Sequence, residues 1–253
     1  MQILSLNING FVGTKNKRNY SGDTNKNGNV VSVFAKIFSN CDPDIIILSE
    51  FNVNSEAGKY AMGILNSKGY HAIYPNVGKS IGRRITSIVL VFSKSQGQSC
   101  ESSGPVSLKW NEVICGEYTI VGVHVPFSAS RHQYERKRAE KYWDAMVKHF
   151  EEHQSERVIY IGDMNVYKSG TYGMKQLETL LKKGAKDAWI ERTGLKHNDI
   201  KGFTYKKSTR ADYVIMSENA YDVLVSIENM QGFYNEKLSD HSGILIDLES
   251  YYK

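Results

Sequence analysis

The sequence predicts an α+β fold in which two β-sheets pack face to face and helices cover their outer sides. Short apolar runs, typical of strands that are covered on both faces, recur from one end of the chain to the other. Longer segments with apolar residues at helical spacing stand between some of them, without the strict alternation of a parallel α/β protein. The 253 residues are enough for a substantial core, and we expect one domain over residues 1–253.

In the first half of the chain, a strand over residues 3–8 is expected to precede a helix over residues 30–38, which carries an apolar stripe. A second helix over residues 58–68 is expected to end at Gly69, because glycine readily adopts the left-handed conformation that follows a helix. Further strands are expected at residues 45–48, 71–74, 86–93, 112–115 and 118–125.

In the second half, residues 131–153 give the clearest helical pattern, with aromatic and aliphatic residues interleaved with charged ones. A strand over residues 157–161 and a helix over residues 174–182 follow. Late strands are expected at residues 213–216, 223–227 and 243–248. Residues 10–29 are rich in Asn, Lys, Gly and Ser and are expected to form a solvated loop.

Composition sets broad limits on function. Apolar residues make up 41% of the chain, too many for a disordered protein, and the net charge of +5 favours a polyanionic partner through non-specific attraction. Cys41, Cys100 and Cys115 are too scattered for a zinc site or a disulfide framework, so we expect reduced thiols. With no signal peptide and no membrane-spanning run recognised, we expect a cytoplasmic protein that does not contact membranes.

Three carboxylates stand at strand ends that lie far apart in the sequence, namely Glu50, Asp163 and Asp240. Side chains at such positions are often aimed into one cleft by a rigid sheet. Together with the amide oxygens of Asn7 and Asn165 they make a set of hard ligands suited to Mg²⁺, with Mn²⁺ as a substitute, rather than to zinc. Because Mg²⁺ usually shares its coordination with substrate phosphate, the set points toward phosphoester chemistry.

Two histidines and a basic loop complete the candidate residues. His124 lies near the end of a predicted strand and His241 shortly precedes one, and both can titrate near neutral pH. The loop over residues 76–84 carries Arg83 and Arg84 and could contact phosphate, although a plain surface loop is the simpler interpretation of such a charged segment.

Six short segments in a fixed order carry a family resemblance. They are LNING (residues 6–10), ILSE (47–50), GVHVP (122–126), GDMN (162–165), RADY (210–213) and SDHS (239–242). Their order resembles the motif series of the endonuclease/exonuclease/phosphatase superfamily, which includes exonuclease III and deoxyribonuclease I. The resemblance covers nearly the whole chain and implies a four-layer α/β/β/α sandwich of two mixed sheets, with the cleft at one edge.

The resemblance also implies roles for the matching residues. Glu50 would be the principal Mg²⁺ ligand, with Asn7 and Asp240 beside it. Asp163 would align or deprotonate the attacking water, and Asn165 would hold a phosphate oxygen or the metal.

The same resemblance implies that His241, oriented by Asp240, acts as a base or binds the scissile phosphate, so the proton could pass to Asp163 or to His241. His124 would bind phosphate or assist the leaving group. Asp212 would orient His124 or His241 through a hydrogen bond.

Each of these residues also has a structural role open to it. Asn7 could cap a turn, and Asn9, which we include as a substrate-binding candidate, precedes Gly10 in a common turn dipeptide. Glu50 could begin a helix, and Asp212 could pair with Arg210.

A Mg²⁺-dependent nuclease that acts on DNA, or on RNA, is the function we expect, from a protein that we expect to be a monomer. Thr209 stands where family members that cleave at abasic sites carry an aromatic residue, which disfavours an abasic-site pocket. The alternatives are a phosphatase or phosphodiesterase for a small phosphorylated metabolite or lipid headgroup, and a binding module without activity.

Overall fold

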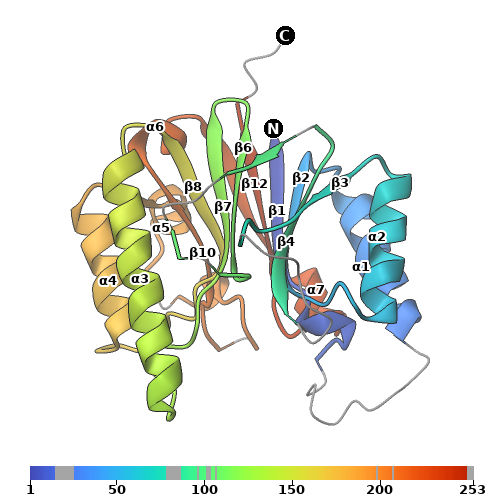
Figure 1. The fold of residues 1–253 in the computed structure, drawn as a ribbon, viewed down its shortest axis with the longest axis horizontal. Helices are drawn as coiled ribbons and strands as arrows, with labels where there is room; N and C mark the ends of the chain where they lie inside the picture. Colours follow the sequence, from blue (N-terminus) through green and yellow to red (C-terminus); the bar gives the residue numbers. More distant parts are fainter. Residues whose placement is uncertain are drawn as a thin grey trace.

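The structure is a computed structural model that describes residues 1–14, 26–77, 87–95, 97–100, 104–105, 107–197, 199–206 and 208–249. Over these residues the strands form two six-stranded sheets that pack face to face. Helices α1 (Lys26–Asn40) and α2 (Glu56–Ser67) cover the outer side of one sheet, and α3 (Gln133–His153) and α4 (Tyr172–Lys182) cover the outer side of the other (Figure 1). The predicted four-layer sandwich of two mixed sheets is therefore confirmed.

The first sheet has the strand order β11-β12-β1-β2-β4-β3. Its central strands β1 and β2 are parallel, whereas β1 and β12 are antiparallel, so the ends of β1 and β2 lie at the same edge as the start of β12. Its strands are β1 (Gln2–Asn7), β2 (Ile45–Phe51), β3 (His71–Ile73), β4 (Ile88–Ser93), β11 (Leu224–Met230) and β12 (Gly243–Leu248).

The second sheet has the order β5-β6-β7-β8-β10-β9. Strands β7 and β8 are parallel and end at the same level, because His124 pairs with Asp163, and β10 starts there in the antiparallel sense, because Asp212 also pairs with Asp163. Its strands are β5 (Gln98–Ser99), β6 (Trp110–Cys115), β7 (Tyr118–His124), β8 (Arg157–Asp163), β9 (Lys186–Asp187) and β10 (Asp212–Met216).

The helices that cover the sheets are amphipathic, and two of them begin at polar caps. Ser55 and Thr171 each accept a hydrogen bond from a backbone N–H of the first turn, at the starts of α2 and α4. Gly69, as predicted, follows α2 with a positive φ of 84°. The helices are α1 (Lys26–Asn40), α2 (Glu56–Ser67), α3 (Gln133–His153), α4 (Tyr172–Lys182), α5 (Ala188–Thr193), α6 (Glu218–Tyr221) and α7 (Gly232–Asn235), with 3₁₀ turns at Asn9–Phe11 and Ile200–Gly202.

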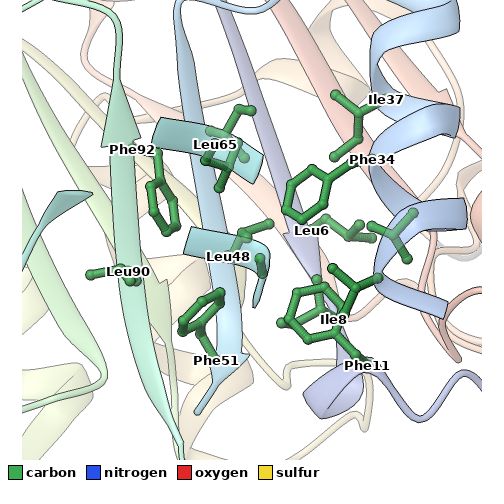
Figure 2. Packing of buried hydrophobic residues seen from close by; sticks show 14 of the residues in the cluster. Leu6, Ile8, Phe11, Phe34, Ile37, Leu48, Phe51, Leu65, Leu90 and Phe92 are labelled. Carbon is green, nitrogen blue, oxygen red and sulfur yellow. The ribbon is translucent and has the colours of Figure 1, made fainter. Parts of the chain in front are cut away.

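Apolar packing fills all three spaces between the layers. β-Branched side chains such as Ile47 and Ile161 form the cluster between the two sheets. Aromatic and leucine side chains join the first sheet to α1 and α2, where the rings of Phe11 and Phe51 meet edge to face with centroids 5.9 Å apart (Figure 2). A third cluster around Trp143 joins the second sheet to α3 and α4. These clusters hold the strands, and hence the site at their ends, in place.

The prediction of a loop over residues 10–29 is wrong at both ends, and residues 15–25 lie outside the described part of the chain. A 3₁₀ turn forms at Asn9–Phe11, and α1 begins at Lys26 despite asparagine and glycine in its first turn. Asn29 compensates for this weak helix propensity, because its side-chain amide donates to the carbonyl oxygens of Phe11 at 2.9 Å and Leu238 at 3.2 Å. In the part of the chain described, none of the helices combines the length and apolarity that crossing a membrane requires.

Candidate active site

Polar side chains from both sheets meet at the edge where β1, β2, β7 and β8 end. The amide Nδ2 of Asn7, at the end of β1, donates to Oδ2 of Asp163, at the end of β8, over 3.0 Å. This buried hydrogen bond joins the two sheets directly at the site. The convergence follows from the strand directions, because parallel strands deliver their final residues to one edge.

Asp163 is the centre of the arrangement. Its Oδ1 accepts the backbone N–H of Asn165 at 3.0 Å, and its Oδ2 lies 3.7 Å from Nε2 of His124 and 3.9 Å from Nε2 of His241. Burial raises the pKa of Asp163 to about 6, and the charge of Asp212 adds to the rise, while His241 opposes it. A carboxylate with such a pKa is ionised at neutral pH and remains a capable proton acceptor.

The orientation of the Asn7 amide is set by its two hydrogen bonds. Nδ2 faces Asp163, which can only accept when ionised, and Oδ1 accepts the backbone N–H of Asn9 at 3.0 Å. A carbonyl oxygen has two lone pairs, so Oδ1 retains one for a cation. Asn9 itself is buried and its side chain donates to the carbonyl of Gly13 at 2.9 Å, so the structure gives it a supporting position beside Asn7.

His241 is held by Asp212 rather than by its chain neighbour Asp240. Nδ1 of the imidazole lies 2.8 Å from Oδ2 of Asp212, which fixes a proton on Nδ1 and points Nε2 toward Asp163. Thr204 fixes the backbone at Asp212, because its hydroxyl accepts hydrogen bonds from the backbone N–H groups of Ala211 and Asp212 at 3.0 and 2.9 Å. Of the two partners expected for Asp212, the structure therefore brings it to His241.

The pKa of His241 is raised to about 9. Burial lowers it, but the charge and hydrogen bond of Asp212, followed by the charges of Asp163 and Asp240, raise it by more. Because the pKa in the folded state lies above that in the unfolded state, the ion pair stabilises the fold fully below pH 6.5, and this contribution disappears as the pH rises to about 9. The contribution is about 3 kcal/mol.

We predict that the His241 ring of metal-free protein remains an imidazolium at neutral pH, with a titration midpoint near 9 in NMR spectra. Asp212→Asn removes the nearest negative charge and is expected to lower that midpoint. It should also flatten the loss of unfolding free energy between pH 6.5 and 9. An unchanged midpoint in the variant would show that Asp212 does not control the charge of His241.

Glu50 and His124 line a cavity of about 280 Å³ beside Asp163. Nε2 of His124 lies 3.8 Å from Oε1 of Glu50, and the carboxylate is 22% exposed, so it can still be reached from solvent. Glu50 has a positive φ of 57° at an irregularity in the pairing of β2 with β4. Positive φ is uncommon for glutamate, and such strained positions occur where a side chain is re-aimed toward a site.

Asn165 also has a positive φ, of 50°, and its amide Nδ2 donates to the carbonyl of Val125 at 3.0 Å. It lines the same cavity as Glu50 and His124. The turn that carries Asp163 and Asn165 is therefore tied to the turn after β7.

Gly162, directly before Asp163, allows β7 and β8 to approach closely. Its φ is +139°, and a Cβ added there would lie 2.2 Å from the carbonyl oxygen of Val123. We predict that Gly162→Ala destabilises the protein by about 2–5 kcal/mol through backbone strain and overpacking. Gly63→Ala is the control, since a Cβ in α2 meets nothing within 4 Å and is expected to stabilise by about 0.5–1 kcal/mol. Equal unfolding free energies of the two variants would contradict this.

The remaining expected residues are Arg83, Arg84 and Asp240. Arg83 and Arg84 lie outside the described residues. Asp240 precedes His241 and is half-buried; its backbone carbonyl accepts the N–H of Lys206 at 3.2 Å, and its charge acts on His241. The alternative in which Asp212 pairs with Arg210 is wrong, because Arg210 forms a buried ion pair with Asp187.

Sequence reasoning missed two residues at the site. The Ser239 hydroxyl donates to the carbonyl of Asn7 at 2.5 Å and accepts the N–H of His241 at 3.1 Å, so it links two site residues. Its presence in the SDHS segment (residues 239–242) could have indicated that Ser239 lies at the site. Lys109, from the turn before β6, puts Nζ 3.4 Å from Nδ1 of His124 and belongs to no motif. Burial lowers the pKa of Lys109, while the charge of Asp163 opposes the shift.

The oxygen donors at the site fit a hard divalent cation. Within the described residues, no three His, Cys, Asp or Glu side chains are grouped closely enough to hold a metal by themselves. Mg²⁺ does not require such a group, because it takes one or two carboxylates and completes its shell with waters and substrate phosphate. The carboxylate of Glu50 and the remaining lone pair of Asn7 Oδ1 are of that kind.

The chain matches the model of the Endonuclease/Exonuclease/phosphatase family over residues 4–241. Similar structures include a Neisseria 3′ phosphatase, NExo, solved with a product DNA hairpin, at 14% identity and a TM-score of 0.75, covering 99% of this chain and 100% of that one. An AP endonuclease from Archaeoglobus fulgidus is similar at 14% identity and a TM-score of 0.74, with 99% and 100% covered. The AP endonuclease LMAP from Leishmania major has 14% identity, a TM-score of 0.71, and coverage of 98% and 87%.

No curated protein matches the sequence. At these identities the structural likeness shows a shared deoxyribonuclease I-like fold. The family match extends over nearly the whole chain and includes Asn7, Glu50, Asp163 and His241. The chain therefore belongs to the endonuclease/exonuclease/phosphatase family.

Proposed function

We propose that the protein is a divalent-metal-dependent phosphodiester hydrolase in which Asp163 accepts the proton of the attacking water. The observation that carries the proposal is the position of Asp163, whose carboxylate is oriented by Asn7 and Asn165 and lies within 4 Å of both His124 and His241. Members of the family are generally dependent on a divalent metal.

The charges of the two central groups favour Asp163 over His241 as the base. At neutral pH Asp163, with a pKa of about 6, is ionised, and His241, with a pKa of about 9, is protonated. Asp163 can therefore take a proton from water, while His241 can donate one to a phosphate oxygen or neutralise its charge. His124 and Asn165, on the cavity wall, would hold the other phosphate oxygens.

Glu50 and Asn7 would hold Mg²⁺ or Mn²⁺. When bound, the cation would polarise the phosphate and stabilise negative charge that develops on its oxygens. Asn7 would also hold Asp163 through Nδ2, which would keep the proton acceptor at a fixed position relative to the cation.

We infer that the substrate is nucleic acid, with DNA favoured over RNA. The net charge of +5 favours polyanions. Aromatic rings adjoin the site and could stack on bases: Tyr205 lies 4.8 Å from the ring of His241, and Phe127 and Tyr167 are stacked at 5.4 Å, within 17° of parallel. The similar Neisseria structure contains a DNA hairpin.

The test is hydrolysis of supercoiled plasmid, single-stranded DNA and RNA in the presence of Mg²⁺, Mn²⁺ or EDTA. Metal-dependent cleavage by the wild type that is lost in Glu50→Ala and His241→Ala would support the proposal. If folded protein that binds Mg²⁺ cleaves no polymer, the nuclease function is wrong.

A small phosphorylated molecule is the second candidate substrate, favoured by the modest cavity of about 280 Å³ beside Glu50 and His124. The dependence of the hydrolysis rate on salt concentration distinguishes the two substrate classes. Hydrolysis of a polymer is expected to slow steeply between 50 and 200 mM salt, because its binding releases counterions, whereas hydrolysis of a small phosphoester is expected to change little.

A further inference from the structure

Lys109 is anchored where the second sheet meets α3. Its backbone carbonyl accepts both the N–H of His124 at 2.9 Å and the hydroxyl of Tyr142, on α3, at 2.7 Å. The side chain then runs to the imidazole of His124, where Nζ lies 3.4 Å from Nδ1 and 3.5 Å from Nε2. Nε2 of the same imidazole lies 3.8 Å from Glu50 and 3.7 Å from Asp163, so Lys109 and both carboxylates border one ring.

The Lys109 side chain is half-buried, and the charges of Asp163 and Glu135 favour its ammonium form, but neither carboxylate forms a direct ion pair with it in the described part of the chain. Removing a cation from water is costly unless an anion compensates it. Lysines placed in this way are therefore good candidates for binding an anion that arrives with a ligand.

A second cation faces the same space. Arg138, on α3, lines the 280 Å³ cavity together with Lys109 and His124. Glu135, also on α3, lines the cavity as a second carboxylate beside Glu50, and it accepts a hydrogen bond from the hydroxyl of Ser130. Because Glu50, Asn165 and His124 line the cavity as well, a group bound by Lys109 and Arg138 would lie next to the scissile phosphate.

We propose that Lys109 and Arg138 form a second phosphate subsite, which binds the phosphate adjacent to the scissile one in substrates that carry at least two phosphates. The inference rests on the proposed hydrolysis at His124 and Asp163, and it adds a preference that this chemistry alone does not require. The second phosphate could come from a polynucleotide backbone or from a small bisphosphorylated molecule.

The experiment compares the thymidine dinucleotide TpT with its 5′-phosphorylated and 3′-phosphorylated forms, in the wild type, Lys109→Met and Arg138→Met. Methionine keeps the length of the lysine stem without the charge. A charge-assisted hydrogen bond contributes about 1.5–3 kcal/mol, so each variant is expected to raise KM about 10- to 100-fold for one of the phosphorylated forms. The loss should be at least about tenfold smaller for TpT, and Lys109→Arg should restore most of the affinity.

Lys148→Met is the matched control. Lys148 lies on α3, ten residues beyond Arg138, with its side chain 70% exposed, and its removal changes the net charge by the same amount. It is expected to leave all three KM values unchanged. A sugar bisphosphate and the corresponding monophosphate, assayed in parallel, show whether the subsite serves a small molecule rather than a polynucleotide.

Equal losses on TpT and on both phosphorylated forms would overturn the proposal, since Lys109 would then act on the scissile phosphate or through His124. No loss on any of them would also overturn it. Binding of the same dinucleotides in EDTA, followed by fluorescence anisotropy of labelled forms, keeps the test independent of hydrolysis. If the wild type hydrolyses nothing, the proposed function fails, while weaker binding of phosphorylated dinucleotide by Lys109→Met would still support the subsite.

Discussion

Asp163→Asn is expected to lower kcat by about 10²- to 10⁴-fold and, in EDTA, to make the protein more stable. The loss of activity follows because an amide cannot take a proton from water. The gain in stability follows because burial disfavours the charged carboxylate, whose pKa rises from 3.8 to about 6. Ionised Asp163 therefore costs about 3 kcal/mol at pH 7, and the new amide loses one hydrogen bond worth about 1 kcal/mol, which leaves a net gain.

The pH dependence gives this prediction a second readout. Because the pKa of Asp163 is raised on folding, the wild type should lose unfolding free energy as the pH rises from 3.8 to about 6, and the variant should not show this loss. Urea denaturation across that range measures it. Asp42→Asn, at an exposed ion pair with Lys94, is the control and should change neither activity nor stability by much. Activity within tenfold of the wild type would exclude Asp163 as the proton acceptor.

Glu50→Gln is expected to remove most of the metal-dependent activity without unfolding the protein. Glutamine has the same shape and can keep the positive φ of 57°, but it offers the cation a neutral oxygen. Metal polarisation supplies several kcal/mol to such reactions, so the rate at low Mg²⁺ should fall by about 10³-fold or more, with partial recovery at high Mg²⁺.

Calorimetric titration of Mg²⁺ into the Glu50→Gln variant measures its Mg²⁺ affinity, whose loss is the expected cause of the lower rate. Weaker binding than in the wild type is expected. Glu56→Gln, in the first turn of α2, is the control, because the Glu56 side chain is 81% exposed and pairs with Lys59 on the same helix. Unchanged Mg²⁺ affinity in Glu50→Gln would place the metal on other ligands.

The layers of the fold could be predicted because each long element carries a strong periodic or continuous apolar pattern. The helix with Trp143 and the strand with Ile47 are examples, and both bury those side chains completely. Short elements could not be predicted in this way. The two-residue strand β9, for example, is defined by its pairing with β10, and its Asp187 is held by Arg210 from farther along the chain.

The convergence of the site could also be anticipated, since Asn7, Glu50 and Asp163 end apolar strands that pack in the two sheets. The partners of each side chain could not. Whether Asp212 holds His124 or His241 depends on the register of β10 against β8, which pairs Asp212 with Asp163. Lys109 reaches the site only because the turn before β6 is bonded to His124, and no local pattern marks that contact.

Hydrolysis in H₂¹⁸O, of whichever phosphoester is turned over fastest with Mg²⁺, shows whether water attacks phosphorus in this reaction. If water activated by Asp163 attacks phosphorus, mass spectrometry should find one ¹⁸O atom in the phosphate product and none in the released hydroxyl, and Asp163→Asn should lose this reaction. Label in the hydroxyl, or no hydrolysis of any phosphoester by folded, Mg²⁺-bound protein, would contradict the proposed mechanism.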